Sequence, residues 1–171
     1  MHMNQKIQEE ILNFHFPSYT EIPNVGLYLE QTQDYITEIL YPLTHEKITK
    51  SMISNYVKKG LISNPVKKKY SRDQIAVLIY LTLAKTVISL EDIQLLIELK
   101  NRSYDNKTAF DYFKKEFENT LYYIFGIKDH LDSVGKDDTF PKALLRNTIM
   151  TFAHKIYLEK SFEMLHEQIN E

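Results

Sequence analysis

Apolar residues recur at every third or fourth position through most of the chain, which is the spacing of helices that bury one face. Only four glycines and five prolines interrupt the 171 residues, so we expect long helices with few breaks. The pattern predicts helices over residues 5–16, about 27–41, 50–59, 72 to about 87 and 90–100, then a long helix that ends at Gly126 and another that begins near Pro141.

Three of these helices have a distinct apolar pattern. The helix from residue 72 to about 87 is apolar nearly all round, so it should be the central buried helix. The last two helices each carry an apolar stripe, and we interpret the aromatic one as core in preference to the wall of a ligand cavity. Their members are Phe110, Phe113, Phe117, Leu121 and Ile124, and then Leu145, Ile149, Phe152 and Ile156.

Polar residues mark where the middle helices begin and end. Thr49 is placed to cap the helix over 50–59, and Gly60 to end it in a left-handed conformation. Ser71 and Gln74 have the S-x-x-Q spacing of a capping box.

A short β-hairpin is predicted between these two helices. Asn64-Pro65 is a turn signal, and the segment 66–70 that follows reads as strand. In this prediction Lys67 and Lys69 lie on one side, with Val66, Lys68 and Tyr70 on the other.

The net charge is only −2, but charged residues are distributed unevenly along the chain. Residues 47–72 carry eight basic side chains and no acidic one, so the other 145 residues hold 13 basic and 23 acidic side chains, a balance of −10. A basic patch on an otherwise acidic protein is typical of a phosphate-binding face, because the acidic remainder orients the basic side toward DNA.

The predicted helix over 50–59 places its polar residues on the face opposite Ile53, Tyr56 and Val57. We predict that this helix reads DNA bases and that the hairpin contacts phosphates. For Tyr56, packing beneath the hairpin is an equal alternative. The predicted DNA-binding residues are Lys50, Ser51, Ser54, Asn55, Tyr56, Lys58, Lys59, Lys67, Lys68, Lys69, Tyr70 and Arg72.

Two family resemblances support this interpretation. The run ITKSMISNYVKKGLI, followed by KKKYSRDQIAVLIYL, resembles the MerR-type signature of a capped recognition helix, a glycine-leucine-isoleucine turn, a basic wing and a tyrosine-serine helix start. The longer run from YTEIPNVGLYLEQ to ISLEDI, over roughly residues 18–123, is similar to an uncharacterised bacterial family, domain of unknown function 1836.

These resemblances imply a mostly α-helical protein with a MerR-like winged helix-turn-helix core, a small β-hairpin wing and C-terminal helices. Residues 1–22 would form an N-terminal helix and loop, 23–100 the winged helix-turn-helix domain, and 101–171 a core extension or dimerisation region. The implied function is a transcriptional regulator that binds double-stranded DNA, and we expect a homodimer. The link from Tyr41 to Thr49 is longer than a tight helix-turn-helix turn, and Ser54 stands where that family usually has arginine.

Other chemistry has weaker signals. The chain has no cysteine, which excludes disulfides and thiolate metal sites. A loop around His130 with Asp129, Asp132, Asp137 and Asp138 could imitate a divalent metal site, but we favour a solvated acidic loop. We therefore predict no enzyme, no metal and no cofactor, and the sequence does not indicate an effector.

The expected location is the cytoplasm, since no apolar run is long enough to cross a membrane. A rival hypothesis keeps the helix-turn-helix scaffold but assigns the basic face to an acidic protein partner.

Overall fold

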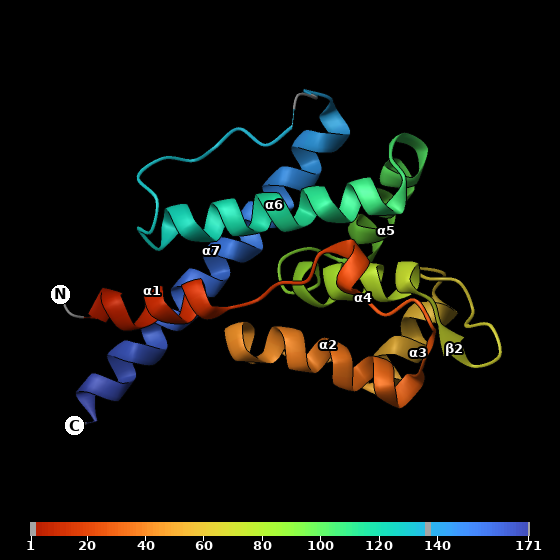
Figure 1. The fold of residues 1–171 in the computed structure, drawn as a ribbon, viewed down its shortest axis with the longest axis horizontal. Helices are drawn as coiled ribbons and strands as arrows, with labels where there is room; N and C mark the ends of the chain where they lie inside the picture. The colour runs from red at the N-terminus through yellow and green to blue at the C-terminus, as the bar shows by residue number, and fades with distance from the viewer. Residues whose placement is uncertain (1–2, 136–137, 171) are drawn as a thin grey trace.

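A computed structural model describes residues 3–135 and 138–170, and these are mostly helical (Figure 1). A two-stranded antiparallel sheet accompanies the helices. The elements are α1 (Met3–Asn13), a 3-10 turn η1 (Tyr19–Glu21), β1 (Leu27–Tyr28), α2 (Leu29–Thr44), α3 (Lys50–Lys58), β2 (Lys69–Tyr70), α4 (Arg72–Ala84), α5 (Leu90–Ser103), α6 (Asn106–Ile124) and α7 (Phe140–Ile169). None of the helices in the described ranges has the length and apolarity of a membrane span.

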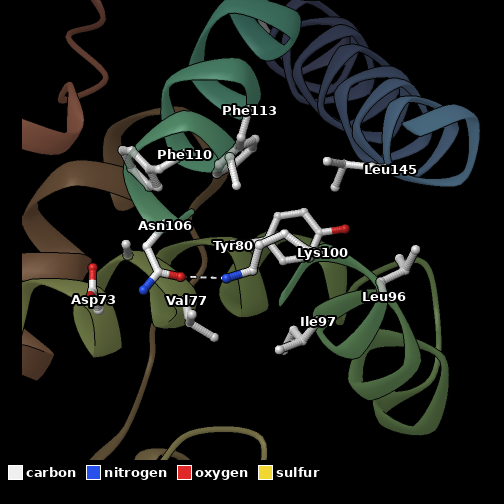
Figure 2. Close-up of a pocket in the computed structure, with 12 residues that line it drawn as sticks. Asp73, Val77, Tyr80, Leu96, Ile97, Lys100, Asn106, Phe110, Phe113 and Leu145 are labelled. Carbon is white, nitrogen blue, oxygen red and sulfur yellow. Dashed lines mark hydrogen bonds between the residues drawn. The ribbon is translucent and has the colours of Figure 1, made fainter. Parts of the chain in front are cut away.

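Helix α4 is the centre of the core, as its sequence predicted. All of its residues from Gln74 to Ala84 except Val77 are buried. Helices α2, α6 and α7 pack around it, because a helix that is apolar on every side must be covered on every side. Figure 2 shows Phe110 and Phe113 of α6 close to Tyr80 of α4, and the rings of Tyr80 and Phe113 meet edge to face at 5.3 Å.

The aromatic stripe of α6 packs against α7, which confirms its interpretation as core. Phe113 and Phe117 lie with their ring centroids 6.0 and 5.4 Å from that of Phe152 on α7. Helix α7 has 30 residues and is therefore about 45 Å long. It runs past α6 and continues beside α1, so that both chain ends lie at one end of the molecule and α3 and β2 at the other (Figure 1).

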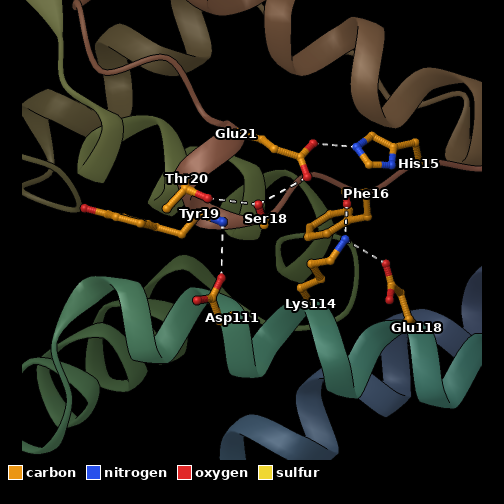
Figure 3. A network of polar contacts seen from close by, with 9 residues as sticks. All are labelled: His15, Phe16, Ser18, Tyr19, Thr20, Glu21, Asp111, Lys114 and Glu118. Carbon is orange, nitrogen blue, oxygen red and sulfur yellow. Dashed lines mark hydrogen bonds and ion pairs between the residues drawn. The ribbon is translucent and has the colours of Figure 1, made fainter.

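The segment between α1 and β1 is clamped onto α6 (Figure 3). Phe16 is fully buried, and its ring lies 5.2–5.7 Å from three phenylalanine rings of α6. The Lys114 ammonium donates a hydrogen bond to the Phe16 carbonyl, and the Tyr19 amide donates one to Asp111 at 3.2 Å. Helix α1 ends at Asn13, earlier than predicted, because the chain must leave the helix for Phe16 to enter the core.

The same segment is also tied to α4. The Tyr19 hydroxyl donates to Asp73 at 2.7 Å. The Arg72 guanidinium donates to the carbonyls of Ile22 and Thr20 at 2.7 and 3.1 Å, and it lies over the Tyr19 ring. The chain therefore enters β1 from a position fixed by both α4 and α6.

Candidate nucleic-acid interface

Helix α3 begins and ends as its sequence predicts. The Thr49 hydroxyl accepts a hydrogen bond from the Met52 amide at 3.1 Å. Gln33 of α2 accepts another from the Lys50 amide at 2.8 Å, which satisfies a second free donor of the first turn. Gly60 follows the helix with φ of 75°, the left-handed conformation that a glycine adopts without strain.

The two faces of α3 differ sharply in exposure. Ile53 and Tyr56 are buried, and Met52 and Val57 are partly buried against the core. The opposite face consists of exposed polar and cationic side chains: Lys50, Ser51, Ser54, Asn55 and Lys58.

The four residues that follow Asn64-Pro65 make a tight turn, in which Val66 is followed by three lysines. Val66 and Lys69 exchange two backbone hydrogen bonds, at 3.1 and 3.0 Å. Lys67 and Lys68 occupy the central positions with φ of 49° and 65°, the signature of a type I′ turn. Such turns favour Asn-Gly, because other side chains are strained at positive φ. Lysines at both positions therefore sacrifice some stability, and both of their side chains are exposed.

This lysine turn, residues 66–69, is held by a strand that the sequence pattern does not reveal. In the antiparallel β1–β2 pair, Leu27 is opposite Tyr70 and Tyr28 is opposite Lys69. The Lys69 ammonium lies 5.2 Å from the centre of the Tyr28 ring. Lys67 and Lys68 form the turn itself, so the prediction that places them on opposite sides of a strand is wrong.

The lysines of α3 and of the turn lack acidic partners. Within residues 3–135 and 138–170, none of Lys50, Lys58, Lys59, Lys67, Lys68 and Lys69 forms an ion pair. Six lysines elsewhere do so, namely Lys6, Lys107, Lys114, Lys128, Lys155 and Lys160. We use the name lysine face for the exposed residues of this end of the molecule: Lys50, Ser51, Ser54, Asn55, Lys58, Lys59, Lys67, Lys68 and Lys69.

Three predicted DNA contacts lie outside the lysine face. Tyr56 and Tyr70 are 3% and 4% exposed, and burial raises the pKa of both hydroxyls. Of the two alternatives for Tyr56, packing in the core is therefore correct and contact with DNA is not. Arg72 is occupied by the carbonyls of Thr20 and Ile22, so its guanidinium supports the fold. Sequence alone missed Gln33 and Tyr28, which hold α3 and Lys69 and carry no motif of their own.

Replacing Arg72 by methionine should test its assignment as a tether. Methionine keeps an apolar stem over Tyr19 but loses both hydrogen bonds, so the free energy of unfolding in urea should fall by about 1–2 kcal/mol. The salt dependence of any DNA binding should stay as in the parent protein. A variant with parental stability and a reduced salt dependence would instead place Arg72 on a phosphate.

The acidic loop after α6 contains a local cluster of charges. The two ring nitrogens of His130 lie 2.6 Å from Asp129 and 2.9 Å from Asp132. These carboxylates raise the pKa of His130, with the Asp129 hydrogen bond as the main cause. Asp138 is exposed, and Asp137 lies outside the described residues. Among the residues that the structure describes, no group of three or more histidines and acids is arranged to hold a metal.

Comparison with protein families gives a match over residues 17–122, which is more than half of the chain. The chain belongs to the family described as Domain of unknown function (DUF1836). The predicted resemblance to this family is thereby confirmed, with limits one residue away at each end. The DUF1836 region contains the clamped segment from residue 17 onward, the sheet and the whole lysine face, and it ends within α6. Searches of curated proteins and of solved structures found no match to the chain.

Proposed function

We propose that this DUF1836 protein binds double-stranded DNA through the lysine face and acts as a transcriptional regulator. The observation that carries the proposal is the gathering of six lysines on a capped helix, its C-cap and the nearby turn, none of which has an acidic partner among the described residues. Unpaired cations on an otherwise acidic protein attract a polyanion, because binding releases counterions from the phosphates.

The dimensions of α3 suit a DNA groove. An α-helix with its side chains is about 10–12 Å across, and the major groove of B-DNA is about 12 Å wide, so the exposed face of the nine-residue α3 can enter it. Asn55 can pair with the edge of an adenine, while Ser54 offers one weaker hydroxyl contact. We therefore expect modest sequence specificity on top of a strong phosphate contribution.

The order of elements supports a winged helix-turn-helix assignment of MerR type. A strand, two helices, a basic turn and a buried helix follow one another from β1 to α4. Helix α2 continues through Pro42 to Thr44, so the link to α3 is shorter than the sequence suggested. His45 ends α2 with φ of 55°, which supplies the sharp change of direction that a glycine often makes in such turns.

A homodimer is part of the proposal. The C-terminal half of α7 exposes four apolar side chains at spacings of four, three and four residues, which is the repeat of a coiled-coil seam. They are Leu158, Phe162, Leu165 and Ile169, with 52%, 57%, 40% and 79% exposed. Replacing Phe162 and Leu165 together by glutamate should convert a dimer into a monomer in analytical ultracentrifugation. Parental sedimentation of that variant would exclude this seam.

A salt titration of DNA binding tests the proposal. The fluorescence anisotropy of a labelled 24-base-pair duplex is measured with the protein from about 50 to 300 mM salt. The Kd should rise with salt, with a slope of log Kd against log salt of up to about 5 for each protomer if all six of its lysines contact phosphates. If no duplex binds at the lowest salt, the proposal fails and the acidic-protein partner becomes the better hypothesis.

A further inference from the structure

Helices α4, α5, α6 and α7 line two adjoining hollows. The inner one has a volume of about 60 Å³ and is lined mainly by apolar side chains, including Val77, Leu96, Phe110 and Phe113 (Figure 2). The outer one, which we call the cleft, has a volume of about 450 Å³. Leu96, Lys100 and Leu145 line both hollows, so the two adjoin.

A buried hydroxyl without a hydrogen bond lies in the wall of the inner cavity. Tyr80 is 9% exposed, and its hydroxyl makes no hydrogen bond within the described residues. Burial raises the pKa of Tyr80, and Thr148 offsets part of that rise. The single hydroxyl proton of Thr148 is donated to the Leu144 carbonyl at 2.8 Å, so Thr148 does not donate a hydrogen bond to Tyr80. In Figure 2 the Tyr80 hydroxyl points to the side of the cavity where Leu96 and Leu145 lie. An unsatisfied buried hydroxyl costs free energy, which a ligand with a polar group would recover.

The outer cleft has a cationic wall. Among the described residues, four lysines line it against a single aspartate: Lys100, Lys107, Lys115 and Lys142, with Asp111. Lys107 is paired with Asp111 at 2.5 Å. The ammonium of Lys142 lies over the Tyr112 ring at 5.6 Å, and Lys100 donates to Asn106. Burial lowers the pKa of Lys100, while the nearby Asp73 and Asp105 oppose this shift. The cleft thus presents more positive charge than its own acids neutralise.

We propose that this pair of hollows binds a small aromatic carboxylate that carries a second polar group at its far end. The carboxylate lies among Lys100 and Lys142, and the ring stacks in the cleft beside Tyr112. The second polar group enters the inner cavity and pairs with the Tyr80 hydroxyl. The inner cavity alone is too small for the ring, because an apolar cavity of about 150 Å³ is the size that accepts benzene.

The position of this site connects it to the lysine turn. Asp73 lines the inner cavity, and the next residue, Gln74, donates hydrogen bonds to the Ser63 and Asn64 carbonyls at 2.8 and 3.2 Å. Those two residues precede the lysine turn. The second polar group of the bound ligand pairs with Tyr80 on α4, the helix that holds this loop, so ligand binding changes the affinity for DNA. This regulatory role rests on the proposed function, whereas ligand binding does not.

Calorimetric titration of the full chain with 4-hydroxybenzoate tests the site. We expect a Kd below about 1 mM, and at least tenfold weaker binding of the uncharged 4-hydroxybenzamide. Lys142→Met and Tyr80→Phe should each weaken binding at least fivefold. Tyr80→Phe removes only the unsatisfied hydroxyl, so the variant should fold normally. Lys155→Met, on the far half of α7 and paired with Glu159, is the matched control and should bind as the parent does.

Two results would overturn the proposal: no heat of binding with 4-hydroxybenzoate, or the same Kd for the parent and for both cleft variants. The regulatory role is tested separately by the Kd for a DNA duplex with and without saturating 4-hydroxybenzoate. A change of at least threefold is expected, and an unchanged value would refute regulation. Failure to bind any duplex would instead refute the proposed function, while the calorimetric result would still decide the site.

Discussion

Replacing Lys67, Lys68 and Lys69 together by alanine is expected to weaken the binding of any duplex about 100-fold or more at about 100 mM salt. Each lysine that neutralises a phosphate contributes about 0.9 to the slope of log Kd against log salt, so this slope should fall by up to about 2.7. All three side chains are exposed and, within residues 3–135 and 138–170, none forms an ion pair, so their charges are available to phosphates. Anisotropy titrations at several salt concentrations measure both quantities.

The matched control removes three other lysines, namely Lys6, Lys128 and Lys155. Their loss changes the net charge by the same amount, but each is paired with an acid away from the lysine face. The control should keep the parental slope. If both triple variants lose affinity equally, DNA responds only to overall charge, and the lysine turn has no special role.

A second variant of the turn separates charge from folding. Lys67→Asn with Lys68→Gly removes two charges and installs the residues that type I′ turns prefer. The free energy of unfolding of this variant in urea should equal that of the parent or exceed it by up to about 1 kcal/mol. Its DNA affinity should fall. A loss of affinity with gained stability cannot be explained by damage to the fold.

Replacing Phe16 by alanine should have the largest effect on stability, a loss of about 3–5 kcal/mol. Its ring is fully buried against the rings of Phe110, Phe113 and Phe117, and its carbonyl accepts the Lys114 hydrogen bond. The deletion leaves a cavity at the point where the segment before β1 is clamped to α6. Urea unfolding followed by circular dichroism at 222 nm measures the change.

Phe162 on α7 provides the control for this deletion, since 57% of its surface is exposed. Phe162→Ala should change the free energy of unfolding by less than about 0.5 kcal/mol when measured on the dissociated chain. Equal losses at both positions would contradict the assignment of Phe16 as a core residue that holds the sheet in place.

Local signals in the sequence were sufficient to predict α3 and α4. The side chains of Thr49 and Ser71 cap the following residues directly, and Gly60 takes its left-handed conformation within the same turn. The burial of α4 on every side also follows from its composition alone. These features depend on neighbours within a few positions, so no tertiary information was needed.

The partners of the lysine turn could not be predicted, because they lie far away in the chain. A two-residue strand such as β1 has no periodicity, and nothing at Leu27 signals its pairing with Tyr70. Lys67 and Lys68 lack the asparagine or glycine that would mark a type I′ turn. Arg72 was predicted as a DNA contact because the sequence shows no partner for it. The acceptors of its hydrogen bonds are backbone carbonyls, which no side-chain pattern reveals.

The most direct test of DNA recognition is a nuclear magnetic resonance titration of the ¹⁵N-labelled protein with a short duplex. The amide signals of α3 and of residues 66–69 should shift first and furthest, with those of Ser54 and Asn55 among them. Signals from the C-terminal half of α7, at the opposite end of the molecule, should stay in place. Shifts confined to α6 and α7, with the α3 and turn signals unchanged, would contradict the assignment of the lysine face as the DNA-binding surface.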